Sequence, residues 1–346
     1  MKKVRVIQIG IGHDHATDVL DSMVSLKQNF EVVAFAVPEE EKTKFSEKIR
    51  LYTKTIGVKQ VSMEEALNLK DIDGAVIETE EANLCKYAYL AAQKGLHIHM
   101  DKPGSAVYEE FAKLIELLKK KKLVLSMGYM YRFNPEMKKV IREAEYGNLG
   151  NIYSVEAHMN CEHTLDKRRW LANLPGGMMF FLGCHLIDFV YRLKGEPMEI
   201  VPFNTCMDQE KIGADDFGMA VFKYQDGASL IKVCAAECGG FLRRQIVICA
   251  EKGTIEIRPI ERWLTNRIFS FNGCTERKNM SSSVRNITEI GNWHSDAQFK
   301  ESEPFNRYDD MMCNFAERIN GKEEPVYTYD YELSLYSLIL KACARR

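Results

Sequence analysis

The first third of the chain alternates between two hydrophobic periodicities. Short apolar runs rich in β-branched residues predict buried strands, and the stretches between them carry apolar residues at helical spacing. Strands separated by helices of this length pair in parallel through right-handed crossovers, so we predict a doubly wound α/β sheet over residues 1–125. The predicted strands cover residues 4–9, 31–37, 74–79, 97–100 and 123–127, and the predicted helices cover residues 14–27, 39–49, 83–94 and 106–121.

From about residue 150 the pattern changes to strands joined by short turns that contain glycine. Short turns join antiparallel neighbours, so we predict a second α/β domain over residues 126–346 with an open, mostly antiparallel sheet. Its C-terminal helices could pack back on the first domain. The predicted strands cover residues 152–159, 214–224, 228–236, 245–250 and 254–258, the helices cover 183–194, 306–319 and 329–344, and the weakly periodic stretch 272–304 is predicted to be a loop.

Length and charge agree with a two-domain globular protein of ordinary composition. The 346 residues exceed the size at which a single hydrophobic core keeps growing. The 47 Lys and Arg residues nearly balance the 49 Asp and Glu residues, which argues against binding to nucleic acid or to an anionic membrane. No apolar stretch approaches the roughly 18 residues of a membrane span. The ten cysteines lack the paired spacing of zinc or redox sites, so we expect buried free thiols in a reducing cytoplasm and no metal.

A glycine motif follows the first predicted strand and opens a helix. The motif consists of Gly10, Ile11, Gly12, His13, Asp14 and His15. Gly10 permits a tight turn, and Gly12 lets the backbone approach a pyrophosphate at the positive end of the helix. His15 replaces the third glycine of the usual fingerprint. We therefore predict a Rossmann domain that binds NAD(P) through this turn, with His13 and His15 either facing the ligands or exposed at the helix start.

The end of the second strand bears on the choice between NAD and NADP. The residue that usually grips the adenosine ribose is acidic, but here the strand ends in Val37 and Pro38. Glu39 or Glu40, just beyond, could take that role and would repel a 2′-phosphate. No arginine lies near the turn to bind such a phosphate. We therefore expect NAD, with NADP as the less favoured cofactor.

Four further segments, in this order and spacing, complete a recognisable pattern: Thr79-Glu80, Asp101-Lys102-Pro103, residues 128–135 (GYMYRFNP) and residues 175–188 (PGGMMFFLGCHLID). Over nearly its whole length the chain resembles the glucose–fructose oxidoreductase / inositol dehydrogenase / MocA (Gfo/Idh/MocA) family, and the Asp-Lys-Pro tripeptide is the most specific element. The resemblance implies hydride transfer between NAD(P) and a secondary hydroxyl of a polyol, namely a sugar, glycoside or cyclitol. It also implies a homodimer or homotetramer formed through the C-terminal sheet.

The resemblance assigns roles to individual residues. Lys102 would reach between the nicotinamide and the substrate and accept the hydroxyl proton, which must leave as hydride is removed. His185 matches the catalytic histidine of the family and would relay that proton. Arg132 would either contact the ligand or anchor the interdomain segment. The implied cofactor contacts beyond the glycine motif are Thr79, Glu80, Asn83, Asp101 and Lys102, and the implied substrate contacts are Lys102, Tyr129, Arg132, His163, Trp170 and His185.

The chain departs from the family pattern at Phe181. An acidic residue usually stands at this position, four residues before the catalytic histidine, and a phenyl ring can neither accept a proton nor hold a hydroxyl. Either Lys102 and His185 suffice, or Glu162 or Asp166 supplies the acid. Two other functions stay open: an elimination or epimerisation that uses NAD without net redox change, and a catalytically silent protein that binds a sugar or dinucleotide.

Overall fold

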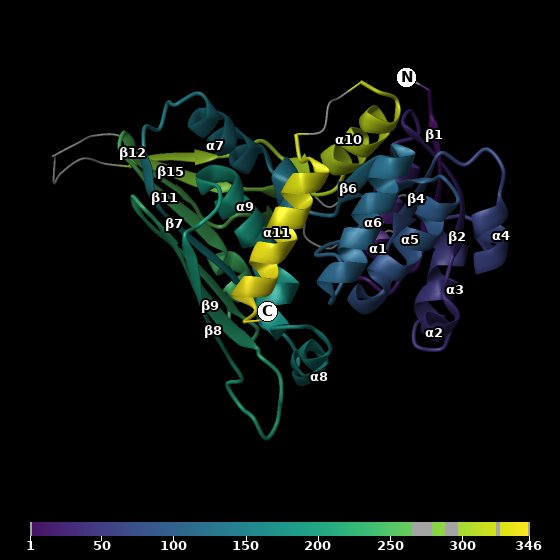
Figure 1. The fold of residues 1–346 in the computed structure, drawn as a ribbon, viewed down its shortest axis with the longest axis horizontal. Helices are drawn as coiled ribbons and strands as arrows, with labels where there is room; N and C mark the ends of the chain where they lie inside the picture. The colour runs from purple at the N-terminus through teal and green to yellow at the C-terminus, as the bar shows by residue number, and fades with distance from the viewer. Residues whose placement is uncertain (1, 265–278, 288–296, 323–325, 345–346) are drawn as a thin grey trace. The chain divides into compact units, whose positions relative to one another are not determined.

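The computed structural model describes residues 2–264, 279–287, 297–322 and 326–344. These residues divide into two compact units (Figure 1). Within the described part of the chain, unit 1 comprises residues 2–130 and 307–336, and unit 2 comprises residues 131–264, 279–306 and 337–344. The helix α10 (Asp309–Ile319) therefore belongs to unit 1, and the unit boundary at residue 337 falls inside α11 (Tyr329–Ala342).

The described strands of unit 1 form one parallel sheet in the order β3-β2-β1-β4-β5-β6. The strand order reverses beside β1, between β1 and β4, and ligands of doubly wound folds bind at this point beyond the carboxyl ends of the strands. Helix α5 packs on α6, and α1 packs on α10. The predicted doubly wound sheet is confirmed. The bounds are β1 Val4–Ile9, β2 Phe30–Ala36, β3 Gln60–Val61, β4 Gly74–Ile77, β5 His97–Met100, β6 Leu125–Met127, α1 Ala16–Ser25, α2 Glu39–Lys42, α3 Ser46–Thr55, α4 Met63–Asn68, α5 Leu84–Gln93 and α6 Tyr108–Lys121.

Unit 2 is built on an eight-stranded sheet in the order β16-β15-β12-β11-β7-β10-β9-β8. Among the described strands of this sheet, only β7 and β10 pair in parallel, so the predicted open, mostly antiparallel sheet is confirmed. Helix α9 contacts β7 and β10 on one face of this sheet. The bounds are β7 Ile152–Asn160, β8 Glu199–Thr205, β9 Phe217–Tyr224, β10 Gly227–Cys234, β11 Gln245–Ala250, β12 Gly253–Ile257, β15 Ser283–Ile287, β16 Gln298–Glu301, α7 Pro135–Glu145, α8 Leu165–Trp170 and α9 Cys184–Lys194.

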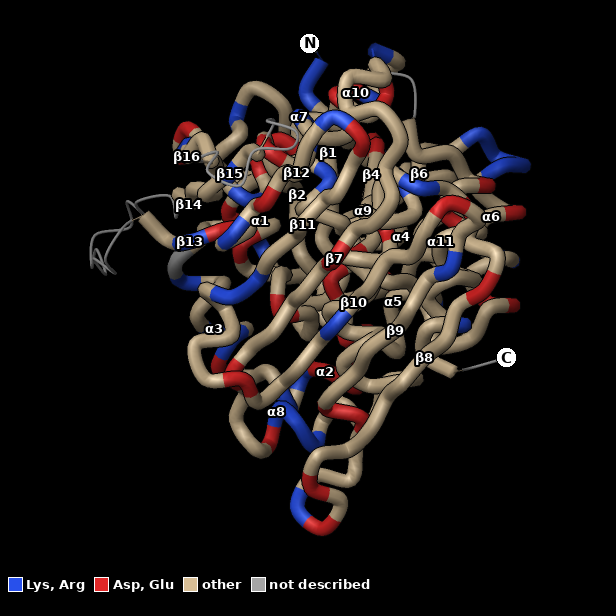
Figure 2. The backbone as a smooth tube through the Cα atoms, turned by 90° about the vertical axis from the view of Figure 1, so that its left-hand side faces the viewer, with Lys and Arg blue, Asp and Glu red and all other residues tan. Residues whose placement is uncertain are grey.

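The other face of this sheet carries no helix in the view of Figure 2, where β7, β10, β9 and β8 cross the picture through mostly uncharged positions. On β9, buried residues alternate with half-exposed ones, as expected when only one face of a strand is packed. We call the less buried side of the sheet its outer face.

The prediction of a loop over residues 272–304 is wrong for the part that the structure describes. Strands β14 (Asn279–Ser281), β15 and β16 lie in this stretch, and β14 joins β13 (Arg262–Trp263) and β17 (Phe305–Asn306) in a small sheet. Short strands near a sheet edge bury few residues, so their apolar alternation is weak. Strand β8 was also missed. Pro202 interrupts its pattern, and proline is tolerated there because β8 is an edge strand.

Two further expectations from the sequence concerned buried free thiols and the absence of a membrane span. None of the nine cysteines in the described part of the chain forms a disulfide, but Cys238 is exposed and three others are half-buried, contrary to the expectation of buried thiols. Within the same residues, no helix has both the length and the apolar character needed to cross a bilayer.

Candidate nucleotide and proton-transfer site

The turn after β1 is shaped by two glycines that lie against the residues following β4. Gly10 has a φ of +87°, and a Cβ there would come within 2.5 Å of Thr79. A Cβ on Gly12 would come within 2.7 Å of the backbone nitrogen of Glu80. Any larger residue would push the turn away from β4. The predicted cofactor contacts Thr79 and Glu80 therefore lie directly beside the glycine turn.

Helix α1 begins with donors that no side chain caps. His15 is its N-cap residue, and the His15 side chain makes no capping hydrogen bond. The Gly12 N–H also has no acceptor among the residues that the structure describes. Unpaired N–H groups and the positive end of the helix dipole attract an anion. The turn therefore fits the pyrophosphate group of NAD(P).

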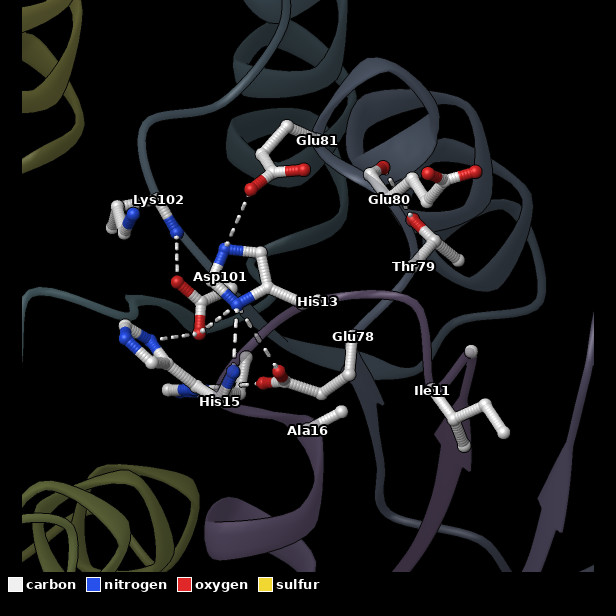
Figure 3. A network of polar contacts seen from close by, with 12 residues as sticks. Ile11, His13, His15, Ala16, Glu78, Thr79, Glu80, Glu81, Asp101 and Lys102 are labelled. Atoms are coloured by element: carbon white, nitrogen blue, oxygen red, sulfur yellow. Dashed lines mark hydrogen bonds and ion pairs between the residues drawn. The ribbon is translucent and has the colours of Figure 1, made fainter. Parts of the chain in front are cut away.

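Two histidines of this turn and the aspartate that follows β5 form a buried polar cluster (Figure 3). His15 Nδ1 lies 3.0 Å from Asp101 Oδ2, and His13 Nδ1 lies 3.3 Å from the same oxygen. The side chains of His13 and Asp101 are fully buried, and that of His15 is 13% exposed. The alternative of histidines exposed to solvent at the helix start is therefore wrong, because both rings contact the end of β5.

Two glutamates that follow β4 extend this cluster. Glu78 Oε2 lies 3.9 Å from His13 Nδ1, and Glu81 Oε1 lies 3.6 Å from His13 Nε2. Both glutamate side chains are buried. Neither residue was singled out from the sequence. The available signal was an acidic residue at the carboxyl end of an apolar strand, the edge where ligands bind in such folds.

Burial and neighbouring charges shift the pKa values in this region. Desolvation lowers the pKa of His13 well below its usual value, and it lowers the pKa of His99 on β5 to about 4. Desolvation raises the pKa of Glu78 well above its usual value. Burial also acts to raise the pKa of Asp101, but the adjacent His13 and His15 outweigh it and hold that pKa below its usual range. Burial thus disfavours the charged forms of His13 and Glu78, whereas the neighbouring histidines favour the ionised form of Asp101.

Lys102 begins the turn that leaves the carboxyl end of β5. Its side chain is fully buried, and its backbone N–H donates to Asp101 Oδ1 at 2.7 Å. The peptide bond between Lys102 and Pro103 is cis. A Cβ on Gly128, just after β6, would come within 2.8 Å of the Asp101 Cα, so glycine allows these two strand ends to approach. Lys102 thus lies at the edge of the sheet where ligands bind.

Sequence reasoning missed an acidic residue that lies against the glycine turn. Glu41 is fully buried, and its Oε1 accepts a hydrogen bond from the Glu80 N–H at 2.6 Å. Its Oε2 accepts a longer bond from the Ile11 N–H at 3.5 Å. Burial raises the pKa of this carboxyl group. Because α2 follows β2 directly, Glu41 lies in the region where a Rossmann domain usually has its ribose-binding acid.

The two acids that were predicted for this role are more exposed than Glu41. The Glu39 side chain is 84% exposed. Glu40 accepts hydrogen bonds from Lys86 at 2.9 Å and from Tyr87 at 2.8 Å. The assignment of Glu39 or Glu40 to the ribose therefore stays a prediction, and the short helix α2 directs its third glutamate, Glu41, inward. The helical spacing after Pro38 was the signal that could have distinguished them.

The remaining predicted residues of unit 1 differ in their surroundings. Ile11 and Tyr129 are buried, with relative exposures of 0% and 1%. Asn83 is half-buried at the end of the short 3-10 turn Glu81–Asn83, and Asp14 is exposed. The roles of these four residues as cofactor or substrate contacts therefore stay predictions.

In unit 2, His185 lies in the first turn of α9, as predicted. A single π-helical turn, Met179–Gly183, precedes it. The side chain is buried, and its ring stands edge-on to Tyr131 with the ring centroids 5.1 Å apart. Tyr131 in turn donates a hydrogen bond to the buried Glu261, and Arg244 Nη1 lies 3.2 Å from the same carboxylate. This supporting network was not predicted, because Tyr131 and Glu261 are 130 positions apart.

Phe181 belongs to an aromatic group near the start of α8. Its ring centroid lies 5.3 Å from that of Trp170 and 6.1 Å from that of His163. The Lys167 ammonium group lies 4.6 Å from the Phe181 centroid, a cation–π contact. The structure thus brings together His163 and Trp170, two predicted substrate contacts, around the residue that replaces the acid of the family.

Neither candidate for a replacement acid lies buried beside His185. The Asp166 side chain is 93% exposed and pairs with Arg169 at 3.3 Å. Glu162 is also exposed. Both carboxylates face solvent, so the hypothesis that one of these residues supplies the missing acid stays a prediction.

Arg132 forms a buried ion pair with Asp188. Its Nε and Nη2 atoms each donate to one carboxylate oxygen at 2.8 Å, in a bidentate arrangement. The two side chains are only 4% and 7% exposed. The guanidinium group thus joins the start of unit 2 to α9, which agrees with the anchoring alternative for this residue.

Two family models match the chain. The model described as oxidoreductase family, NAD-binding Rossmann fold, matches residues 4–129. The model of the GFO/IDH/MocA C-terminal domain matches residues 136–256. Together the two models cover most of the chain.

Curated relatives are similar at low identity. D-xylose 1-dehydrogenase (NADP(+)) 2 of Haloferax volcanii is 26% identical over 168 residues, which are 48% of this chain and 51% of that protein. Myo-inositol 2-dehydrogenase of Thermotoga maritima is 22% identical over 65% of this chain and 66% of that protein. The chain spans about half the length of the first curated relatives that it matches.

Solved structures share the fold along nearly the whole chain. A 3-ketoreductase from Actinomadura kijaniata, crystallised with NADP and TDP-benzene, has a TM-score of 0.76 at 16% identity and covers 98% of this chain and 96% of its own. An aldose-aldose oxidoreductase from Caulobacter crescentus has a TM-score of 0.76 at 17% identity, with coverage of 99% and 98%. From the two family matches we conclude that the chain belongs to the Gfo/Idh/MocA family of oxidoreductases.

Proposed function

We propose that this protein is an NAD(P)-dependent oxidoreductase that transfers hydride between nicotinamide and a secondary hydroxyl of a sugar, glycoside or cyclitol. One observation carries the proposal. The glycine turn after β1 and the buried Lys102 after β5 lie at the same edge of one parallel sheet, which is the edge where such folds bind ligands. The names of the relatives, which include a xylose dehydrogenase and an inositol dehydrogenase, support a polyol as the substrate class.

In this proposal, side chains of the protein accept the proton that leaves the alcohol. When bound, NAD(P) supplies the hydride acceptor or donor. Lys102 accepts the hydroxyl proton, since a positioned side chain must take it as the carbonyl forms. Asp101 holds the backbone of Lys102 through its 2.7 Å hydrogen bond. His185 of unit 2 serves as the second proton-transfer group.

A panel of sugars, glycosides and inositols, each incubated with NAD or NADP, tests the proposed reaction. The measurement is the absorbance of reduced nicotinamide, together with chromatography of the polyol. We expect at least one polyol to be converted to a ketone with stoichiometric formation of the reduced cofactor. Conversion without net reduction of the cofactor would instead indicate elimination or epimerisation. Binding of cofactor and polyol without any conversion would indicate a silent binding protein.

We further propose that the enzyme prefers NAD and that Glu41 sets this preference. An ionised carboxylate beside the glycine turn can accept hydrogen bonds from ribose hydroxyls and repels a 2′-phosphate. The solved 3-ketoreductase complex contains NADP, so the preference varies among proteins of this fold and needs a direct test.

Replacing Glu41 with glutamine tests this assignment. The substitution keeps the shape of the side chain but removes its charge, so the ratio of kcat/KM for NAD over NADP should fall by about tenfold, which corresponds to about 1.4 kcal/mol. The exposed Glu39→Gln is the matched control and should leave the ratio unchanged. An equal ratio in wild type and Glu41→Gln would remove Glu41 from cofactor selection.

The outer face of the unit 2 sheet supports the proposal of a homodimer or homotetramer. The register aligns Val201 with Val221 and Leu230, and Phe203 with Met219, so these side chains form one apolar group across three strands. Phe203 is 59% exposed and Val201 is 42% exposed. Contiguous exposed apolar surface of this kind is typical of an interface.

Replacing Phe203 with aspartate should weaken such an assembly, because a charge would be buried without a partner in the apolar interface. Light scattering after size exclusion should show a dimer or tetramer for wild type and a shift toward monomer for Phe203→Asp. Leu51→Asp is a matched control on α3 of unit 1, where Leu51 is 56% exposed. A wild-type chain that is monomeric at all concentrations would contradict the proposed interface.

A further inference from the structure

The cluster of His13, His15 and Asp101 has the composition and spacing of a transition-metal site. Each residue offers one ligand atom, and the three atoms lie within 4.8 Å of one another. A tetrahedral metal with bonds of about 2.0–2.1 Å holds its ligand atoms roughly 3.4 Å apart. Asp101 Oδ2 lies 3.3 Å from His13 Nδ1 and 3.0 Å from His15 Nδ1, close to that spacing.

The two polar contacts of His13 Nδ1 require opposite protonation states of this nitrogen. The backbone N–H of His15 donates to this nitrogen at 3.2 Å, which requires a lone pair there. Asp101 Oδ2, 3.3 Å away, would instead require an N–H group. A lone pair facing a buried carboxylate oxygen is unfavourable unless a cation lies between them. A metal bound to both atoms removes this conflict, at the expense of the hydrogen bond from His15.

A buried carboxylate without a hydrogen-bond partner lies beside the same nitrogen. Glu78 is fully buried, and neither of its carboxylate oxygens has a hydrogen-bond partner within the described part of the chain. Its Oε2 is 3.9 Å from His13 Nδ1, and Figure 3 shows the carboxylate directed toward that ring. A small rotation of this side chain would make it a fourth ligand. Burial raises the pKa of this carboxyl group well above its usual value, and a bound cation would favour its ionised form.

The second nitrogen of the His13 ring faces another carboxylate. Glu81 Oε1 lies 3.6 Å from His13 Nε2. Histidine ligands of metals usually donate their other N–H to a carboxylate, which orients the ring and increases the basicity of the ligating nitrogen. The same arrangement is found here, because the Glu81 carboxylate faces His13 Nε2 while His13 Nδ1 faces Asp101.

We propose that His13, His15 and Asp101, joined by Glu78 as the fourth ligand, bind one divalent metal of the zinc class. Imidazole nitrogen combined with carboxylate oxygen suits first-row transition metals, whereas Mg²⁺ and Ca²⁺ prefer all-oxygen sites. The ion would link the glycine turn to the residue before Lys102 and would compensate the buried carboxylates. This inference goes beyond the proposed function and differs from the expectation from sequence that there is no metal. His15 and Asp101 lie 86 positions apart, so no local spacing indicates the site.

Metal binding can be measured on the full chain without any assay of activity. Protein stripped with a chelator is titrated with Co²⁺ and followed by visible absorption, and Zn²⁺ content after equilibrium dialysis is measured by elemental analysis. We expect about one metal per chain and a Co²⁺ spectrum of a four- or five-coordinate site. His15→Asn should weaken Co²⁺ binding at least tenfold. His158→Asn, on the outer face of the sheet in unit 2, is the matched control and should bind as wild type does.

A second measurement keeps the proposal testable should His15→Asn fold poorly. Zn²⁺ should raise the melting temperature of wild type, and it should raise that of the isosteric variant Asp101→Asn much less. Substoichiometric metal in wild type would overturn the proposal, as would equal Co²⁺ affinity in wild type and His15→Asn. Because these readouts do not involve turnover, their failure leaves the proposed oxidoreductase function intact, and an inactive enzyme could still bind the metal.

Discussion

Replacing Lys102 with methionine should lower kcat/KM about a hundredfold to ten-thousandfold for any polyol that the panel identifies, the range typical of losing a general acid–base group. Methionine fills a similar volume in this fully buried position but cannot accept a proton. The backbone hydrogen bond from residue 102 to Asp101 does not depend on the side chain. We therefore expect the affinity for NAD(P), measured by fluorescence titration, to stay within a few-fold of wild type.

The matched control for this prediction is Lys113→Met, because Lys113 is an exposed lysine on α6. It should leave the rates unchanged. Wild-type rates in Lys102→Met would remove Lys102 from the mechanism.

The same assay extends to His185 through a double variant. When two groups serve one proton-transfer step, removing both costs little more than removing one of them. Lys102→Met combined with His185→Asn should therefore be nearly as active as the slower single variant. Losses that multiply would show that the two residues act independently.

Replacing Arg132 with methionine should lower the free energy of unfolding of unit 2 by about 3–5 kcal/mol, the usual cost of breaking a buried ion pair from one side. The substitution leaves the Asp188 carboxylate, which is only 7% exposed, without its bidentate partner. Urea unfolding followed by tryptophan fluorescence measures this effect. Because all three tryptophans lie at or beyond position 170, the fluorescence reports on the second half of the chain.

Arg192→Met is the control, because Arg192 and its partner Glu145 are 27% and 45% exposed. Exposed pairs contribute about 0–1 kcal/mol, so this variant should unfold almost as wild type does. Adding Asp188→Leu to Arg132→Met should restore part of the lost stability, because the uncompensated charge disappears. Unchanged unfolding of Arg132→Met would show that the pair does not stabilise unit 2.

Much of the fold could be predicted because each prediction depended on residues close together in the chain. The run from Val4 to Ile9 carries apolar residues on both faces, which indicates a strand buried on both sides, and Gly10 marks its end. The helix that begins near Cys184 follows the same reasoning with a period of 3.6 residues. Where the pattern was weak, as in the edge strands β8 and β16, the prediction missed the element.

The candidate site was predicted less completely. The glycine turn and Lys102 were found because their motif has a fixed spacing. The choice of Glu41 over its two neighbours depended on the direction in which a four-residue helix turns. The pairing of Arg132 with Asp188 joins residues 56 positions apart. No local pattern contains such a contact.

The sequence alone therefore determined the class of fold, the glycine turn and the identity of the principal proton-transfer candidate, because periodicity and short motifs are properties of neighbouring residues. Only the tertiary structure decided that His13 is buried against Asp101 and Glu78, and that the aromatic ring of Phe181 packs against Trp170. The physical reason is that burial and charge compensation are set by segments that the fold brings together. The environment of each buried group is thus a property of the packed unit and not of the motif that contains it.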